Sequence, residues 1–516
     1  MTKFFYVVPV FFIAACGNPQ TVVNKQTAYN EPHRPQVHFS PREHWMNDPN
    51  GMVYSNGIYH LFFQHNPDSS VWGPMHWGHA TSSDLVHWQE QPIALYPDSL
   101  GTIFSGSAVL DANNTSGFGK GGQAPLVAIF THDNPERSKA GRIDVENQSV
   151  AYSTDEGKTW TKYAGNPVVK NPGIRDFRDP KVFWFEPGKK WIMTLATSDH
   201  ITFYSSPNFK DWKKESEFGK GLGAHGGVWE CPDLFPLTYQ GEEVWVLVVN
   251  LNPGGPNGGS ATQYFTGRFD GSQFTPDQTG TKWLDYGPDE YAGITWSNTG
   301  ERKIFLGWMS NWQYAGIVPT EKWRSATTVP RDLSIEKSGV QYLVASRPVR
   351  ELDALADKQE DLKNIDASDY DLTQKTGKLA GPARINLATD KLESFSLTLS
   401  NDAGEMVVVG YDKTANNYFI DRTQAGNTQF EKGFAARHTA PRFSGKDQAD
   451  ITLIIDNASV ELFADNGLSV MTGIFFPNSL FSNIRIQSAA GFKISSLQYS
   501  KLKSIWTAEG PKQAER

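Results

Sequence analysis

The segment Ser153-Thr154-Asp155-Glu156-Gly157-Lys158-Thr159-Trp160 decides the fold, because it is one of several copies of the same short turn. Similar segments lie at residues 83–88, 206–212 and, more faintly, 270–274. In each copy an Asp or Asn caps a tight turn, and an aromatic residue four or five positions later packs beneath it. The copies are roughly 50 to 70 residues apart, which suits one four-stranded propeller blade with its loops. The repeats alone indicate four blades.

Short apolar runs separated by turn signals lie between these copies, as expected for an all-β chain. The clearest runs are at residues 58–63, 126–130, 191–195, 244–249 and 304–308. We therefore predict a β-propeller over residues 36–347.

The pattern changes after this region. Residues 348–366 are rich in Asp, Glu, Leu and Ala and predict a short helix or a charged linker. Beyond them, segments such as 395–399, 451–453 and 460–462 alternate strictly between apolar and polar residues, which is typical of strands with one solvated face. We predict a β-sandwich over residues 367–505.

Three acidic segments carry most of the functional information. They are Trp45-Met46-Asn47-Asp48-Pro49-Asn50-Gly51, Phe177-Arg178-Asp179-Pro180 and Trp229-Glu230-Cys231-Pro232. Each places a carboxylate beside an aromatic residue and a proline, although a buried carboxylate is unfavourable unless it is paired or hydrogen-bonded. Asp-Pro and Asn-Gly are also ordinary turn dipeptides. The recurrence of the whole arrangement favours a site over three unrelated turns.

Two carboxyl groups with opposed roles are what cleavage of a glycosidic bond requires. Asp48 has the amide of Asn47 beside it, which can hydrogen-bond a carboxylate and hold it charged. Glu230 has an apolar setting that suits an acid. We expect Arg178 to keep Asp179 ionised, so that this carboxylate binds sugar hydroxyls.

These motifs resemble those of glycoside hydrolase family 32, which comprises levanases, exo-inulinases and invertases. The resemblance implies that Asp48 is the nucleophile, Glu230 the acid/base and Asp179 the transition-state stabiliser of a retaining hydrolysis. It implies five blades followed by a sandwich that serves stability rather than catalysis, and no cofactor. It also implies substrate contacts from a further set of residues: Asn47, Gln64, Trp72, Phe104, Ser105, Arg178 and Trp323.

The expected substrate is a β-fructan, levan or inulin, or sucrose, and the sequence does not decide between them. The loop at residues 254–259 is one candidate for discrimination at the rim of the site, and a plain flexible loop is the alternative. Two other functions stay open. One is fructosyl transfer, and the other is a non-catalytic surface lipoprotein that binds glycans, although a binding module has no need of all three carboxylates.

The N-terminus predicts export. Ile13-Ala14-Ala15-Cys16-Gly17 resembles a bacterial lipobox at the end of an apolar stretch too short to span a bilayer. We expect a signal peptide over residues 1–16, acylation of Cys16 and a flexible tether over residues 17–35. Membrane contact would then be made by the lipid alone, at the bacterial cell envelope. The alternative is an ordinary signal peptide and a periplasmic or secreted protein.

Composition excludes other classes. The formal charge of −8 argues against a nucleic-acid partner, which needs a basic face. The twelve histidines are scattered and form no zinc-type motif, so we expect no metal.

Overall fold

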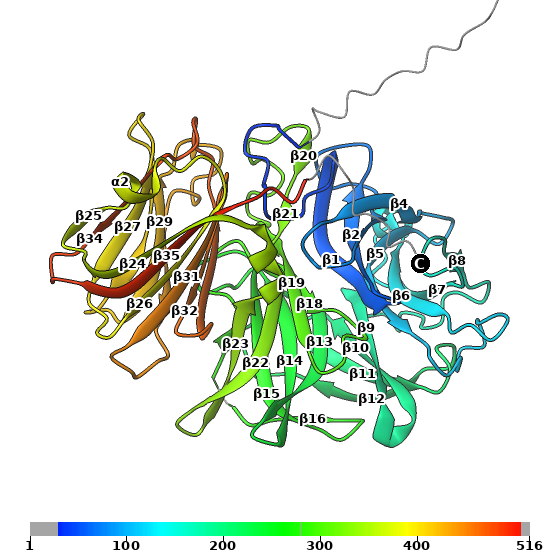
Figure 1. Ribbon diagram of the computed structural model, residues 1–516. Helices are drawn as coiled ribbons and strands as arrows, with labels where there is room; N and C mark the ends of the chain where they lie inside the picture. The colour runs from blue at the N-terminus through cyan, green and yellow to red at the C-terminus, as the bar shows by residue number, and fades with distance from the viewer. Residues whose placement is uncertain (1–28, 279, 507–516) are drawn as a thin grey trace, which may run out of the picture.

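The computed structural model describes residues 29–278 and 280–506, so Cys16 and most of the predicted tether lie outside the described residues. Figure 1 shows two parts side by side, a propeller coloured blue to green and a sandwich coloured yellow to red. No helix in the described ranges is long and apolar enough to cross a membrane.

The propeller consists of five sheets of four or five strands. The first contains β1 (His44–Ser55), β2 (Ile58–Asn66), β3 (His76–Ser82), β4 (Gln89–Leu95) and the short β20 (Trp323–Arg324). The second contains β5 (Thr102–Leu110), β6 (Leu126–Asp133), β7 (Glu146–Ser153) and β8 (Thr161–Lys162). The third contains β9 (Phe177–Phe185), β10 (Lys190–Thr197), β11 (His200–Ser206) and β12 (Lys213–Phe218).

The fourth sheet contains β13 (Val228–Tyr239), β14 (Glu242–Asn252), β15 (Ala261–Phe269), β16 (Phe274–Pro276) and β17 (Lys282–Trp283). The fifth contains β18 (Tyr291–Thr295), β19 (Lys303–Met309), β21 (Ala326–Thr327), β22 (Arg331–Ser338) and β23 (Gln341–Pro348). The first strands of the sheets, β1, β5, β9, β13 and β18, contact one another in sequence and close a ring, because β18 also contacts β1. The parallel pairing of β20 with β1 adds a second link across this closure.

The repeated turns join the third strand to the fourth in the first four sheets. In the first of them, Asp84 Oδ1 accepts the backbone N–H groups of Val86 (3.0 Å) and His87 (2.8 Å). In the fifth sheet the equivalent hairpin between β22 and β23 is Ser338-Gly339-Val340-Gln341, which has no Asp or Asn to cap it. The repeat is therefore visible in four blades although there are five.

The sandwich consists of two six-stranded sheets. In spatial order, one contains β24 (Ala356–Asp366), β35 (Lys493–Leu502), β26 (Ala383–Thr389), β31 (Ala449–Asp456), β32 (Ser459–Ala464) and β33 (Ser469–Ile474). The other contains β25 (Asp369–Asp371), β34 (Asn483–Gln487), β27 (Phe395–Ser400), β28 (Met406–Asp412), β29 (Asn417–Gln424) and β30 (Arg437–Pro441). Helices are short: α1 (Pro135–Lys139), α2 (Thr373–Thr376) and two 3-10 turns, Glu186–Gly188 and Arg350–Leu355.

Two expected boundaries need correction. The predicted linker 348–366 contains a 3-10 turn followed by β24, which pairs with β35 along its length, so the sandwich begins at Ala356 rather than at residue 367. β24 is an edge strand with most of its residues exposed, and it therefore lacks the alternation by which strands are recognised. The end of the predicted tether also packs: Tyr29 stacks on Trp506, with ring centroids 3.8 Å apart, and Arg34 is fully buried.

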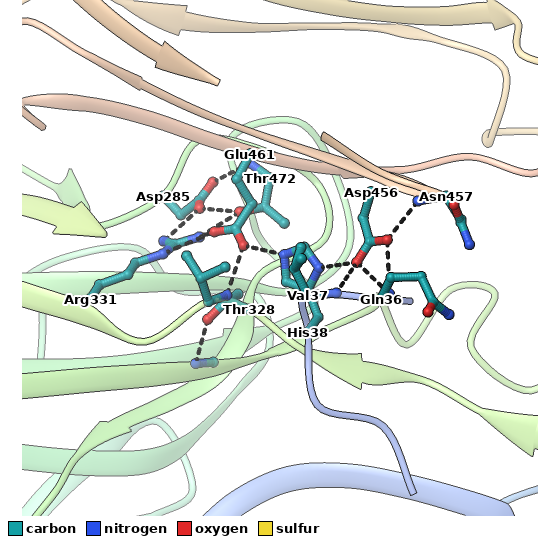
Figure 2. Close-up of polar contacts among 12 residues, drawn as sticks. Gln36, Val37, His38, Asp285, Thr328, Arg331, Asp456, Asn457, Glu461 and Thr472 are labelled. Atoms are coloured by element: carbon teal, nitrogen blue, oxygen red, sulfur yellow. Dashed lines mark hydrogen bonds and ion pairs between the residues drawn. The ribbon is translucent and has the colours of Figure 1, made fainter. Parts of the chain in front are cut away.

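A buried polar network joins the propeller to the sandwich, and Figure 2 shows its contacts. His38, in the segment before β1, bonds Asp456 through Nδ1 and Glu461 through Nε2, both at 2.8 Å. Glu461 also pairs with Arg331 of β22, which pairs with Asp285 at 2.9 Å. These charged side chains are all buried, and each is compensated by an oppositely charged partner within the network, as a buried charge requires.

Candidate active site

All five inner strands carry a β-bulge at the same level. In each, two residues oppose a single residue of the neighbouring strand. The paired residues are Asn47 and Asp48 in β1, Phe104 and Ser105 in β5, Asp179 and Pro180 in β9, Cys231 and Pro232 in β13, and Ala292 and Gly293 in β18. The bulges re-aim side chains, and most of the predicted site residues lie in them or directly before them.

The backbone at three of these bulges is unusual. Asp179, Cys231 and Ala292 have φ values of 63°, 41° and 54°. Residues with a side chain rarely adopt this left-handed region, and such strain persists where the surrounding structure enforces it, often at functional sites. The bulges of β9, β13 and β18 thus share one backbone conformation, in which the first bulge residue has a positive φ.

Asp48 is held by donors on two sides. Asn47 Nδ2 donates to Asp48 Oδ1 and Ser105 Oγ donates to Asp48 Oδ2, both at 2.8 Å. Asn47 is itself fixed, because Trp45 Nε1 donates to its Oδ1 at 2.7 Å. The Cys231 thiol lies 3.6 Å from Asp48 Oδ2. The carboxylate is oriented, and its charge is offset by hydrogen bonds.

Glu230 lies directly before the bulge of β13. Arg178 donates to its Oε1 through Nε (3.2 Å) and Nη2 (3.1 Å), and the Tyr291 hydroxyl donates to its Oε2. Burial raises the pKa of Glu230; the Arg178 guanidinium opposes this shift, and the carboxyl group of Asp48 adds to it. A raised pKa keeps a carboxyl group protonated nearer to neutral pH, as a general acid requires.

Asp179 is not among the carboxylates that Arg178 bonds, although we expected Arg178 to keep it ionised. The Arg178 guanidinium bonds Glu230, Glu146 and Asp176, whereas Asp179 Oδ2 accepts the backbone N–H of Cys231 at 3.0 Å. Burial raises the pKa of Asp179 to about 8; Arg178 opposes the shift, and the carboxyl groups of Glu230 and Asp48 add to it. This direction opposes the expected ionisation of Asp179, because desolvation outweighs a cation that is shared among other carboxylates.

These groups line one cavity of about 220 Å³. Its lining residues are Asn47, Asp48, Gln64, Trp72, Phe104, Ser105, Arg178, Asp179, Glu230 and Trp312. Trp72, 50% exposed, packs edge-to-face on Phe104 at the rim. Gln64 Nε2 is buried and has no hydrogen-bond partner, so a donor is available to a ligand. Aromatic faces together with convergent polar groups suit a sugar ring.

Trp323 is the predicted site residue that the structure places elsewhere. It pairs with His44 at the start of β1, and the Arg34 guanidinium lies over its ring at 4.5 Å. Trp312 lines the cavity instead, with its ring 4.9 Å from that of Trp308. Sequence reasoning also missed Tyr291. Neither Trp312 nor Tyr291 lies in a sequence motif that marks it as a site residue. Trp312 reaches the cavity from the turn after β19, and Tyr291 reaches Glu230 from the position directly before the bulge of β18.

In the described part of the chain, no three His, Cys, Asp or Glu side chains are grouped so that they could hold a metal ion.

Two family models match the chain. Residues 38–346 match the glycosyl hydrolases family 32 N-terminal domain, and residues 351–502 match the family 32 C-terminal domain. A levanase of Bacillus subtilis (strain 168) is 45% identical over 492 residues, covering 93% of this chain and 72% of the levanase. An extracellular exo-inulinase of Aspergillus niger is 40% identical over 500 residues, covering 90% and 93%.

Solved structures agree with this similarity. The exo-inulinase of Aspergillus awamori superposes with a TM-score of 0.84 at 36% identity, covering 93% of this chain and all of that one. A Schwanniomyces occidentalis fructofuranosidase complexed with fructose gives a TM-score of 0.84 at 32% identity, with coverage of 93% and 100%.

Proposed function

The chain belongs to glycosyl hydrolase family 32, and we propose that it is a retaining glycosidase that releases fructose from β-fructans and from sucrose. The similar proteins named levanase and exo-inulinase support this activity. The observation that carries it is the meeting of Asp48, Asp179 and Glu230, from three different blades, in one sugar-sized cavity.

The first step breaks the glycosidic bond. An oxygen of the Asp48 carboxylate bonds to the anomeric carbon of the terminal fructosyl group while the bond from that carbon to the bridging oxygen breaks. Glu230 transfers its proton to the departing oxygen, which leaves as a hydroxyl group. In the second step the Glu230 carboxylate takes a proton from water, and the water oxygen displaces Asp48 from the anomeric carbon. Fructose is released with its configuration retained.

The remaining polar groups are assigned to recognition of the sugar. Asp179 can accept hydrogen bonds from ring hydroxyls, and Asn47 and Gln64 can donate to them. Interactions that tighten as the sugar becomes oxocarbenium-like lower the barrier, whereas equally tight binding of the ground state does not. Arg178 holds Glu230 and is itself fixed by Glu146 at 2.7 Å.

A panel of substrates tests this proposal. The protein is incubated with levan, inulin and sucrose, and the products are resolved by chain length. We expect free fructose from at least one fructan. Free fructose alone identifies cleavage from the chain end, a ladder of oligosaccharides identifies internal cleavage, and longer products from sucrose identify transfer. No product from any of the three would refute the proposal.

We further propose that the protein is exported and held at the cell envelope by a lipid on Cys16. The extracellular relative supports export, and the sequence around Cys16 supports the anchor. Cys16→Ser is expected to abolish lipid labelling and to release the enzyme from the membrane fraction. A single acyl chain binds a membrane only marginally, so stable anchoring implies more than one chain on the mature N-terminus. Wild-type protein found wholly in the medium would contradict the anchor.

A further inference from the structure

Trp312 differs from the three carboxyl residues of the cavity in how it is held. Asp48, Asp179 and Glu230 belong to paired strands, whereas Trp312 lies in a turn after β19 that has no strand partner. The turn begins at Asn311 and includes Tyr314, and the backbone N–H groups of Tyr314 and Ala315 donate to the Asn311 carbonyl at 3.1 and 2.8 Å. The position of Trp312 therefore depends on what holds residues 311–315.

Asn311 ties this turn to the loop at residues 254–259. Asn311 is fully buried, and its Nδ2 donates to the Pro288 carbonyl at 2.7 Å. A Cβ added to Gly259 would lie 2.2 Å from Asn311 Oδ1, so the loop packs directly on this amide. The backbone N–H of Trp312 donates to Ser260 Oγ at 3.2 Å, which adds a second link.

The same loop reaches the sandwich through Asn257. Its Nδ2 donates to the Thr439 carbonyl at 2.9 Å, and its Oδ1 accepts the Thr439 N–H at 3.2 Å. Thr439 lies in β30, the edge strand of its sheet. The Asn257 amide thus makes the pair of bonds that a neighbouring strand would make. The glycine-rich loop at residues 254–259 is thus held on the sandwich at Asn257 and on Asn311 at Gly259.

Tyr314 ties the turn to the sandwich from the other side. Its hydroxyl donates to Asp289 Oδ1 and accepts a bond from Arg422 Nη2 at 3.0 Å. Arg422 belongs to β29, is buried and pairs with Asp289 at 2.7 Å. The Phe434 ring lies 3.8 Å from the Arg422 guanidinium carbon. A buried pair of this kind fixes geometry, because displacing one member leaves the other charge uncompensated.

We infer that the sandwich positions the Trp312 wall of the sugar cavity, through Asn257 on one side of the turn and Arg422 with Tyr314 on the other. Asn257 and Tyr314 are positioning residues, since neither lines the cavity. The inference rests on the proposed function of the cavity and gives the sandwich a part in substrate binding in addition to stability.

Two variants test it, Asn257→Ala and Tyr314→Phe, each of which removes one tie without substituting Trp312 itself. We expect each to raise KM for sucrose about tenfold while kcat changes less than about threefold, because a displaced wall weakens binding of the sugar more than the chemistry. Asn466→Gly is the matched control. It removes the contact of Asn466 with Arg347 Nε at 2.6 Å, another link between propeller and sandwich, which does not involve residues 311–315. This control is expected to keep the wild-type KM.

A double-mutant cycle separates positioning from general loosening. If Tyr314 acts through Trp312, then adding Tyr314→Phe to Trp312→Ala changes neither KM nor the calorimetric affinity for fructose any further. Three results would each overturn the inference and leave the proposed function standing. They are an undiminished effect of Tyr314→Phe on KM in the Trp312→Ala background, an unchanged KM in both single variants, and an equal rise in the KM of the control. A wild-type protein that releases no fructose would overturn the proposed function, and the inference with it.

Discussion

The cavity brings three carboxyl groups together and gives each a different set of donors. Asp48 accepts from Asn47 and Ser105, Asp179 accepts from a backbone N–H, and Glu230 accepts from a guanidinium and a phenol. Burial and mutual repulsion raise the pKa values of Asp179 and Glu230, which makes full ionisation of the group unfavourable near neutral pH. The three carboxyl groups therefore tend to share a proton, and the raised pKa of Glu230 suits its role as the acid.

Glu230→Gln tests the acid/base role, because the amide cannot donate a proton as the acid does. A fructoside with a weakly basic leaving group needs little protonation, so its fructosyl-enzyme should still form. Hydrolysis of that intermediate should be slow, since the same residue activates water. We expect a pre-steady-state burst followed by turnover about 10²–10⁴-fold below wild type, and acceleration by azide, which attacks without a base. Equal losses on good and poor leaving groups, without burst or azide rescue, would exclude Glu230 from this role.

Tyr291→Phe tests the tuning of that acid. The Tyr291 hydroxyl donates to Glu230 Oε2 and so favours the anion; removing it should raise the pKa of Glu230 further. A general acid loses activity as pH rises through its pKa. The alkaline limb of the kcat/KM profile should therefore move to higher pH in the variant, while the acid limb stays in place. A shift of the alkaline limb to lower pH would contradict the assignment.

At the scale of elements, one turn and one bulge recur around the propeller. The capped turn holds the outer edge of four blades, and the bulge on each inner strand presents residues to the channel. In each of the four blades that have both features, the turn and the bulge are on different strands, so a turn can be changed without changing the residues of the site.

Asp84→Ala should therefore destabilise the first blade and leave catalysis intact. The variant loses two backbone hydrogen bonds of the turn, at 3.0 and 2.8 Å, which should cost about 1–2 kcal/mol. The measurement is the melting temperature together with KM. Ser83→Ala, at an exposed residue of the same turn, is the control. A KM raised several-fold in Asp84→Ala would show that the turn reaches the site.

Sequence patterns predicted what is local in this molecule. The capped turns predicted blades, and the acidic motifs predicted Asp48, Asp179 and Glu230, which do meet in one cavity. Trp323 was predicted from its motif, but β20 pairs it with β1 and Arg34 packs on its ring, whereas Trp312 reaches the cavity from a turn that carries no motif. β24 was missed because an exposed edge strand needs no apolar face.

At the scale of the whole molecule, the segment before β1 joins the two parts. His38 lies between two sandwich carboxylates, and one of these, Glu461, also holds Arg331 of the propeller. Burial lowers the pKa of His38, and the hydrogen bonds to Asp456 and Glu461 outweigh this effect and raise it to about 9.

This arrangement predicts a pH-dependent stability. The pKa of His38 in the folded protein lies above its ordinary value of 6.5. Its contribution to the free energy of unfolding is therefore complete below pH 6.5 and is lost as pH rises through about 9. The contribution is on the order of 3 kcal/mol. The gap in melting temperature between wild type and His38→Gln should therefore narrow from pH 6 to pH 10.

His438→Gln is the control for this series. His438 is also buried, but burial lowers its pKa to about 3, so it does not titrate in the same range. Its gap from wild type should stay constant from about pH 7.5 to pH 10, because above its ordinary pKa of 6.5 His438 is neutral in both the folded and the unfolded protein. A gap for His38→Gln that is equally constant would show that His38 is neutral in the folded protein.

The mechanism depends first on the nucleophile, and Asp48→Asn tests that role directly. The amide keeps the shape of the side chain and removes the charge that attacks the anomeric carbon, so the protein should fold with a melting temperature near that of wild type. The decisive measurement is the initial rate of fructose release from sucrose and levan by the variant and by wild type under the same conditions. We expect the rate of the variant to be lower by about 10⁴-fold or more. A folded variant that retains a tenth or more of the wild-type rate would contradict the assignment of Asp48 as the nucleophile.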